Sequence, residues 1–365
     1  MAKNGSDSFP LFNNDRVWLT YVEAREAFQG FSESDLDDIL TVNSGIDPRL
    51  ELVKKALDAG FDKVELSVQG RQPAMDQRLL KNLYTGVLGL LQKDQGGHKG
   101  RLIVLTPNSK GLQEFQDAAK GRLTLDDVTV GAFYSAVDGF DARNHGKPTD
   151  NVLHNYENGV FDTAPHQRHY ISACFGHREF EEITLDVPGS ETGSKQETVL
   201  RSSSYPSIQR LVERIRYAFE HGADEVSIAD SQGLASADET FRVFCYLMSD
   251  YILTPRQRSG LIYHCHNSNE AQGLRNIKAA YAAGIRRFDV GGKGGCSSLP
   301  EDQRTGNISA IKVAHMFQNE GINTGIDLHK LRELTDYVQT KVYHPENTSV
   351  SSYSAEPSAS VSFAK

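Results

Sequence analysis

The chain alternates short β-rich runs with helical stretches, and this alternation constrains its fold more than any other feature. Runs rich in β-branched and aromatic residues predict strands, whereas apolar residues spaced three and four apart predict helices. The predicted strands, nearly all separated by helical periods, are 16–22, 61–67, 101–105, 127–132, 169–174, 225–229, 261–266 and 287–290. Such an order is typical of an α/β protein, because parallel neighbours in a sheet need a crossover connection.

Eight strands, nearly all separated by helices, predict a closed (β/α)8 TIM barrel with an additional C-terminal helix. The predicted helices that separate the strands are 48–59, 77–91, 110–120, 208–221, 237–251 and 270–283. A doubly wound open sheet fits the alternation too. That fold is expected to carry a glycine fingerprint after its first strand, and the sequence VEAREAFQGF has none.

The expected organisation has three parts. An N-terminal segment covers 1–15, the barrel with its C-terminal helices covers 16–344, and a Ser-rich tail that we expect to be disordered covers 345–365. The connection 135–167 is long and rich in Asn, Gly and Asp, and 187–205 is a second polar insertion. Connections of this length in a compact fold are usually functional or mobile.

Charge and composition exclude several classes of protein. A formal net charge of −9 without a Lys/Arg cluster argues against a nucleic-acid partner. No run of about 18 apolar residues predicts a membrane span, and the first residues lack a signal-peptide pattern. Four cysteines without a CxxC pair give no disulfide framework. We therefore expect a cytoplasmic protein without a membrane partner, and a homodimer is compatible with its fold.

Two histidines near the end of the seventh predicted strand, His264 and His266, are the strongest functional signal. Side chains two apart on a strand point the same way, so the two imidazoles converge while Cys265 faces the opposite side. Neutral imidazole is a common ligand for divalent metals. For an isolated His-x-His pair, two hydrogen-bonded core histidines would be the simpler interpretation.

Polar residues at the ends of other strands favour the metal interpretation. In a barrel these ends face one mouth, and they bring Arg25, Glu26, Glu65, Asp230, His264, His266 and the glycine-rich segment 291–296 there. Glu26 can supply an anionic oxygen and Asn307 an amide oxygen. Mixed nitrogen and oxygen ligation with open water positions suits Mg or Mn better than a closed zinc site, with Zn or Co as alternatives.

Several motifs resemble the metal-dependent TIM-barrel lyases and synthases, a superfamily that includes 3-hydroxy-3-methylglutaryl-CoA lyase, isopropylmalate synthase and homocitrate synthase. These are VEAREAFQ, VELS, VLTPNSKG, YISACFG, EVSIADSQG, HCHN, GGKGGCSS and TGN…GINTGIDLHKL. Their order, over roughly 17–331, is similar to that in 3-hydroxy-3-methylglutaryl-CoA lyases. The combination is more specific than any one motif.

The resemblance implies a role for each site residue. Metal ligands would be Glu26, His264, His266 and Asn307. Arg25 would polarise the substrate carbonyl and stabilise the enolate, with Glu65 supporting Arg25 or the ligand shell. Asp230 would take part in proton transfer from the hydroxyl, and Cys296 would be an acid/base group on a mobile loop. Breaking a carbon–carbon bond beside a tertiary hydroxyl needs this combination of base, Lewis acid and cation.

Departures from the family's pattern fall in regions that contact substrate. Glu26 stands where Asp is usual, Lys293 where leucine is typical, and Ser297 where proline follows the cysteine. We expect Lys293 to meet a carboxylate or phosphate of a different acyl compound. Purely structural roles also remain open, because Glu65 can simply pair with Arg25, Asp230 can shape a turn or cap a helix, and Cys296 can be inert.

The sequence therefore predicts a metal-dependent carbon–carbon lyase. Its substrate would be a small acyl or hydroxy-acid compound, carried or not carried on coenzyme A, and cleaved by a retro-Claisen or retro-aldol route. The first alternative is the reverse direction, an acyl-CoA-dependent condensation with a 2-oxo acid. The second is a non-catalytic binding barrel, which the unusual Glu26 and Lys293 motivate.

Overall fold

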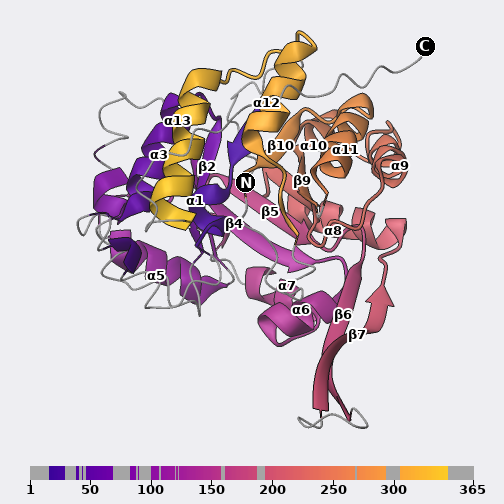
Figure 1. Ribbon diagram of the computed structural model, residues 1–365. Coiled ribbons are helices and arrows are strands. Elements are labelled where there is room, and N and C mark those ends of the chain that lie inside the picture. Colours follow the sequence, from indigo (N-terminus) through magenta and orange to yellow (C-terminus); the bar gives the residue numbers. More distant parts are fainter. Residues whose placement is uncertain are drawn as a thin grey trace.

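The computed structural model describes most of the 365 residues, and Figure 1 shows their arrangement. The described residues are 16–28, 38–40, 43, 47–68, 83–87, 89, 100–106, 108–119, 121, 123–157, 161–186, 194–267, 269–292 and 305–343. Lys293, Cys296, the N-terminal segment 1–15, the tail 345–365 and much of the predicted helix 77–91 lie outside them.

Eight parallel strands form a closed barrel, as predicted. They are β1 (Trp18–Tyr21), β2 (Lys63–Val68), β3 (Leu102–Leu105), β4 (Val128–Ser135), β5 (Gln167–Ser172), β8 (Glu225–Asp230), β9 (Leu261–Asn267) and β10 (Arg287–Val290). Each pairs with its neighbour in this order, and β10 pairs with both β9 and β1, which closes the sheet. A short strand, β11 (Gly306–Asn307), runs antiparallel to β9.

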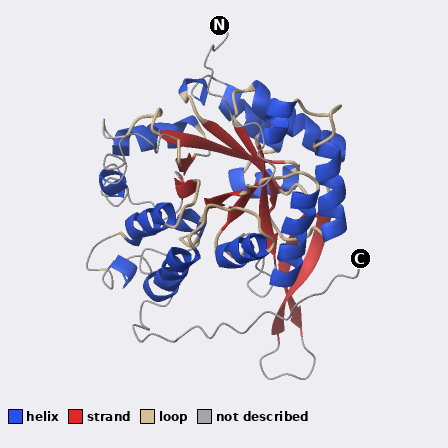
Figure 2. Ribbon diagram, turned by 90° about the horizontal axis from the view of Figure 1, so that it is seen from above, coloured by secondary structure: helices blue, strands red, loops and turns tan. Residues whose placement is uncertain are grey.

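Helices surround the barrel (Figure 2). They are α1 (Glu23–Glu26), α3 (Pro48–Asp58), α5 (Ser109–Ala119), α6 (Asp138–His145), α7 (Thr149–Glu157), α8 (Ile208–Glu220), α9 (Ala237–Leu247), α10 (Pro255–Ser259), α11 (Glu270–Ala282), α12 (Ala310–Asn319) and α13 (Leu328–Val338). Two short turns, η2 (Phe161–Thr163) and η4 (Gln339–Tyr343), complete the elements. The predicted C-terminal helix is α13. No helix of the described residues has the length and apolar character that crossing a membrane requires.

Local sequence signals explain where the longer helices begin. Ser236 caps α9 in a reciprocal capping box with Glu239, and Ser207 caps α8 by accepting the backbone N–H of Arg210. One face of each helix is apolar and packs on the outside of the sheet, where Ile215 and Phe244 are completely buried. The capping residues thus mark where these helices begin, and the apolar faces determine which side packs on the sheet.

Both connections predicted as polar loops contain regular structure. The segment 135–167 holds α6, α7 and η2, and the segment after β5 holds an antiparallel hairpin of β6 (His177–Asp186) and β7 (Ser194–Ser204). The hairpin extends away from the barrel (Figure 1). The four Glu and four Ser residues of these strands hid them, because such residues are not enriched in strands.

The barrel interior contains a buried ionic network around Arg168, on β5. Its guanidinium donates to Glu225 on β8 at 2.9 Å, to Asp289 on β10 at 2.9 Å and to the Thr20 hydroxyl on β1 at 3.1 Å. Lys63 on β2 also bonds Glu225, at 2.9 Å. One side chain therefore connects opposite walls of the barrel through charge-assisted hydrogen bonds.

Stability should depend on pH through Asp141, a buried residue of α6 that accepts the backbone N–H of Ser135 at 2.9 Å. Burial raises the pKa of Asp141 to about 7. The folded state thus keeps a proton that the unfolded chain releases near pH 4, so this group's contribution is full below about pH 4. This contribution disappears as the pH rises to about 7, which lowers the free energy of unfolding by an amount on the order of 2–4 kcal/mol.

Asp141→Asn is therefore expected to flatten the pH dependence, because Asn keeps the oxygen that accepts from Ser135 and does not ionise. Urea unfolding of both proteins at pH 5 and pH 8 measures the effect. The free energy of unfolding of the variant minus that of the wild type should be larger at pH 8 than at pH 5. Equal differences at the two pH values would contradict the proposed titration of Asp141.

Candidate metal centre and active site

Three side chains from two distant parts of the sequence converge at the barrel mouth. Glu26 ends α1, directly after β1, while His264 and His266 lie on β9. All three are buried, and one ligand atom from each lies within 4.8 Å of the other two. The Glu26 carboxylate oxygens are 3.5 Å and 3.7 Å from the Nε2 atoms of His264 and His266, respectively. The alternation of β9 therefore brings the two imidazoles together, as predicted.

The outer ring nitrogens fix how each imidazole presents itself. The Nδ1 atom of His266 lies 2.9 Å from the Ser231 carbonyl oxygen, which can only accept. The Nδ1 atom of His264 lies 3.1 Å from the Asp289 carboxylate. Both Nδ1 atoms therefore donate, and in neutral rings each Nε2 carries a lone pair.

These two Nε2 atoms are only 2.9 Å apart. Two lone pairs at this distance repel unless a proton or a cation lies between them. Histidines that bind a metal usually donate one ring N–H to a carboxylate or carbonyl. Here the Nδ1 atoms do so, and the anionic oxygens of Glu26 lie near the Nε2 atoms. The donor set therefore fits a divalent cation.

The charges around the rings differ, and so do their pKa shifts. Burial lowers the pKa of His266 to about 4, assisted by its neighbour His264. Burial also disfavours charge on His264, but the hydrogen bond to Asp289 and the charge of Glu26 outweigh it and raise the pKa. Burial opposes ionisation of Glu26 as well, and Arg25 with the two rings overcomes it, so the pKa of Glu26 is lowered. Glu26 therefore remains an anionic donor.

Asn307, the fourth predicted ligand, lies beside this cluster. Strand β11 places Asn307 opposite His266 on β9, and its Nδ2 donates to the second Glu26 oxygen at 2.6 Å. A rotation of the amide would direct its oxygen to the same place. The structure thus brings all four predicted metal ligands together.

Arg25 and Glu65 meet next to the cluster. The Arg25 guanidinium forms ion pairs with Glu26 and Glu65, and all three side chains are buried. Burial disfavours the charge of Arg25, but the two carboxylates outweigh it and raise its pKa. The second Glu65 oxygen accepts the Tyr170 hydroxyl at 3.0 Å. The expected contact of Glu65 with Arg25 is therefore present, and a fixed cation lies beside Glu26.

Asp230 ends β8 and is completely buried. Its two carboxylate oxygens accept the backbone N–H groups of Leu234 and Ala235 at 2.9 Å and 3.0 Å. These contacts are those of a residue that shapes a turn, one of the two roles the sequence left open. Burial raises the pKa of Asp230 to about 6. A role in proton transfer stays a prediction.

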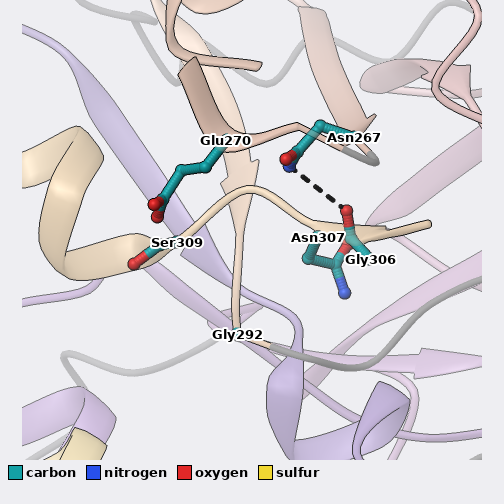
Figure 3. Close-up of a pocket in the computed structure, with 6 residues that line it drawn as sticks. All are labelled: Asn267, Glu270, Gly292, Gly306, Asn307 and Ser309. Atoms are coloured by element: carbon teal, nitrogen blue, oxygen red, sulfur yellow. Dashed lines mark hydrogen bonds between the residues drawn. The ribbon is translucent and has the colours of Figure 1, made fainter. Parts of the chain in front are cut away.

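A polar pocket adjoins the cluster, because Asn307, which bonds Glu26, is part of its lining. Figure 3 shows the lining residues. The volume of the pocket is about 260 Å³, and its lining consists of Asn267, Glu270, Gly292, Gly306, Asn307 and Ser309. Gly292 is the last described residue before the segment that contains Lys293 and Cys296. The pocket therefore lies between a predicted metal ligand and the start of the predicted acid/base segment.

Sequence reasoning missed Asp289 and Arg168, which support the predicted ligand His264 through hydrogen bonds. Asp289 on β10 accepts from His264, and Arg168 in turn bonds Asp289. A lone acid between two apolar residues, Phe288 and Val290, was the available signal. Its partner could not be found from spacing alone, because the contact with His264 arises from the pairing of β10 with β9.

Asp289→Asn should weaken metal binding by about 10–100-fold, the usual effect of losing a charged partner behind a histidine ligand. Asparagine can still accept from His264, but it no longer raises the basicity of the ring. Titration with Mn²⁺ followed by electron paramagnetic resonance measures the affinity. Asp238→Asn, which removes an exposed carboxylate paired with Arg242, is the matched control. Unchanged affinity in Asp289→Asn would remove Asp289 from the site.

The chain is similar to several known proteins. Residues 187–338 match the family model described as HMGL-like. The chain is 34% identical over 139 residues to (R)-citramalyl-CoA lyase from Chloroflexus aurantiacus, covering 36% of this chain and 41% of that enzyme. It is 28% identical over 257 residues to cytoplasmic 3-hydroxy-3-methylglutaryl-CoA lyase from Danio rerio, covering 69% of this chain and 65% of that enzyme. The alignments thus span less than two thirds of these relatives' length.

Solved structures share the fold. An HMG-CoA lyase from Brucella melitensis aligns with a TM-score of 0.64 at 20% identity, covering 90% of this chain and 99% of that chain. An HMG-CoA lyase from Acinetobacter baumannii, in complex with coenzyme A and 3-methylmalate, aligns with a TM-score of 0.65 at 20% identity, covering 91% and 93%. These likenesses establish the (β/α)8 barrel of the chain.

Proposed function

We propose that this chain, which is similar to 3-hydroxy-3-methylglutaryl-CoA lyases, is a divalent-metal-dependent carbon–carbon lyase. Its proposed substrate is a 3-hydroxyacyl thioester or a related hydroxy acid, cleaved by a retro-Claisen or retro-aldol route. The observation that carries the proposal is the convergence of Glu26, His264 and His266, with a hydrogen-bond acceptor behind each ring.

In this proposal Glu26, His264, His266 and Asn307 hold the metal, with Mg or Mn favoured over Zn or Co. When bound, such an ion supplies a Lewis acid for the hydroxyl and carbonyl oxygens of the substrate. The chain's own residues hold the ligands in place, because the Nδ1 hydrogen bonds orient both rings and Asn307 orients the Glu26 carboxylate.

Arg25 supplies the cation near the developing enolate. Its contacts with Glu26 and Glu65 fix the guanidinium before substrate arrives, and a preorganised charge stabilises a transition state more than a mobile one. Glu65 is a positioning residue for Arg25. Tyr170, which donates to Glu65, holds that carboxylate in turn.

Asp230 is the proposed base for the substrate hydroxyl. A carboxylate whose pKa is raised to about 6 by burial is better matched to proton transfer near neutral pH than an exposed one. Its two backbone hydrogen bonds hold it in place and leave further lone pairs on both oxygens. Cys296, proposed as an acid/base group, and Lys293, proposed to bind an anionic group of the substrate, rest on the sequence alone.

Two further elements belong to the proposal. The polar lining of the pocket beside Asn307 suits a hydrogen-bonding part of a small substrate. We also place the protein in the cytoplasm, since Cys174, Cys245 and Cys265 are free thiols. A homodimer stays a prediction.

Incubation of the Mn²⁺-loaded protein with a panel of 3-hydroxyacyl-CoA compounds, followed by mass spectrometry, tests the proposal. Cleavage predicts a shorter acyl-CoA and a carbonyl product in equal amounts. A parallel incubation with acetyl-CoA and a panel of 2-oxo acids tests condensation. Condensation without cleavage, or no metal-dependent turnover in either panel, would overturn the proposal.

Cys296→Ser should lower turnover about 100-fold or more while Mn²⁺ affinity stays within twofold, because a hydroxyl is a much poorer proton donor and acceptor than a thiol. Steady-state kinetics on any cleaved thioester and Mn²⁺ titration give the two quantities. Cys245→Ser is the control, since Cys245 is an exposed residue of α9. Full activity of Cys296→Ser would assign that cysteine no chemical role.

A further inference from the structure

Glu23, the first residue of α1, is completely buried and contacts two segments that are remote in sequence. One carboxylate oxygen accepts the hydroxyl of Tyr343, the last residue of η4. The other accepts the backbone N–H of Gly292, just after β10. Burial and the charge of Glu23 raise the pKa of Tyr343, so the phenol stays protonated and donates. Glu23 thus connects α1, which carries Arg25 and Glu26, to the end of β10 and to the C-terminal turn.

The two glycines after β10 leave space for this carboxylate. A Cβ atom on Gly291 would lie 2.6 Å from one Glu23 oxygen, and a Cβ atom on Gly292 would lie 3.0 Å from the other. The first contact is shorter than any real Cβ contact, and the second is tighter than most. Glycine at both positions therefore lets the backbone approach Glu23 closely.

The backbone that Glu23 holds is a wall of the polar pocket (Figure 3). Gly291 donates to the Ile308 carbonyl at 3.0 Å and accepts from the Ala310 N–H at 2.9 Å. These bonds connect Gly291, the neighbour of Gly292, with the strip that contains Asn307 and Ser309, which also line the pocket. A shift of Gly292 would therefore change the shape of the pocket without removing a metal ligand.

We propose that Glu23 is a positioning residue that fixes the Gly292 wall of the substrate pocket to the turn carrying Arg25 and Glu26, and that the Tyr343 hydroxyl holds Glu23 in this orientation. The inference rests on the proposed function for its effect on substrate. Its physical core, the anchoring of Gly292 by Glu23 and Tyr343, concerns only the described contacts.

The test uses the full chain loaded with Mn²⁺ and compares Glu23→Ala, Glu23→Gln and Tyr343→Phe. Glutamine offers an oxygen to Gly292 and an N–H to the tyrosine oxygen, so it can replace both bonds, whereas alanine replaces neither. Hydrogen exchange of peptides that cover 288–292, followed by mass spectrometry, should be about tenfold faster in Glu23→Ala and in Tyr343→Phe, as for a lost hydrogen bond. Glu23→Gln should stay near the wild-type rate.

A kinetic measurement separates positioning from general stability. With 3-hydroxy-3-methylglutaryl-CoA as the probe, KM should rise about tenfold in Tyr343→Phe, with Mn²⁺ affinity within twofold of the wild type. Tyr337→Phe is the matched control, because Tyr337 lies on α13 six residues earlier and packs against Lys55. It should change neither KM nor exchange.

The outcomes distinguish this inference from the proposed function. If the wild type does not cleave the probe but the exchange pattern is as expected, the proposed function is weakened and the anchoring role of Glu23 stands. Wild-type exchange in both Glu23→Ala and Tyr343→Phe would overturn the inference. So would equal exchange in Glu23→Gln and Glu23→Ala, or equal effects of Tyr343→Phe and Tyr337→Phe.

Discussion

His264→Ala is expected to weaken divalent-metal binding by at least about 100-fold, more than the loss of a group behind a ligand. The substitution removes one of the two nitrogen donors and leaves Asp289 without its imidazole partner. A single remaining histidine with Glu26 and Asn307 cannot surround a cation as the four groups do. In the proposed function, metal-dependent turnover falls with the affinity.

Metal content after gel filtration and Mn²⁺ titration by electron paramagnetic resonance give the result directly. His329→Ala is the matched control, since His329 is 81% exposed on α13 and is not one of the predicted ligands. It should leave the affinity unchanged. Stoichiometric metal retained by His264→Ala would show that the four groups do not form the site.

Arg168→Met should lower the free energy of unfolding by about 3–5 kcal/mol, the usual effect of removing one partner from a buried ionic network. Methionine matches much of the apolar stem but leaves Glu225 and Asp289 inside the barrel with less positive charge around them. Glu225 keeps Lys63 and Arg287, and Asp289 keeps Ser227 and His264. These remaining partners are the reason that we expect a folded but weakened protein.

Urea unfolding at neutral pH measures this loss. The control is Arg242→Met, which breaks an exposed pair with Asp238 on α9 and should cost less than about 1 kcal/mol. Similar losses in the two variants would mean that the network inside the barrel contributes no more than a surface pair. A difference of several kcal/mol would confirm the central role of Arg168.

The barrel was predictable because its signals are local. The spacing of apolar residues within one segment predicts each element, as it does for the strand Leu261–Asn267 and the helix Ile208–Glu220. The convergence of His264 and His266 followed from strand alternation alone. Strand order then placed Glu26 at the same mouth. These steps need only periodicity and the geometry of parallel strands.

The remaining features depend on contacts that periodicity does not encode. Asp289 meets His264 because β10 pairs with β9, and Glu23 meets Tyr343 from 320 positions away. Arg168 resembles an ordinary strand residue until the barrel closes around it. The hairpin of β6 and β7 was hidden by its polar composition. In each case the sequence shows a suitable side chain, and only the assembled barrel shows its partner.

Closure of the barrel between β10 and β1 also has a consequence for biosynthesis. Glu26 and Asn307 are 281 positions apart, so a ribosome that has made the first ligand must still produce most of the chain before the last emerges. No nascent fragment that ends before β11 can enclose a cation in this way. In the proposed function, metal capture should therefore be a late event, which needs β11 as well as the pairing of β10 with β1.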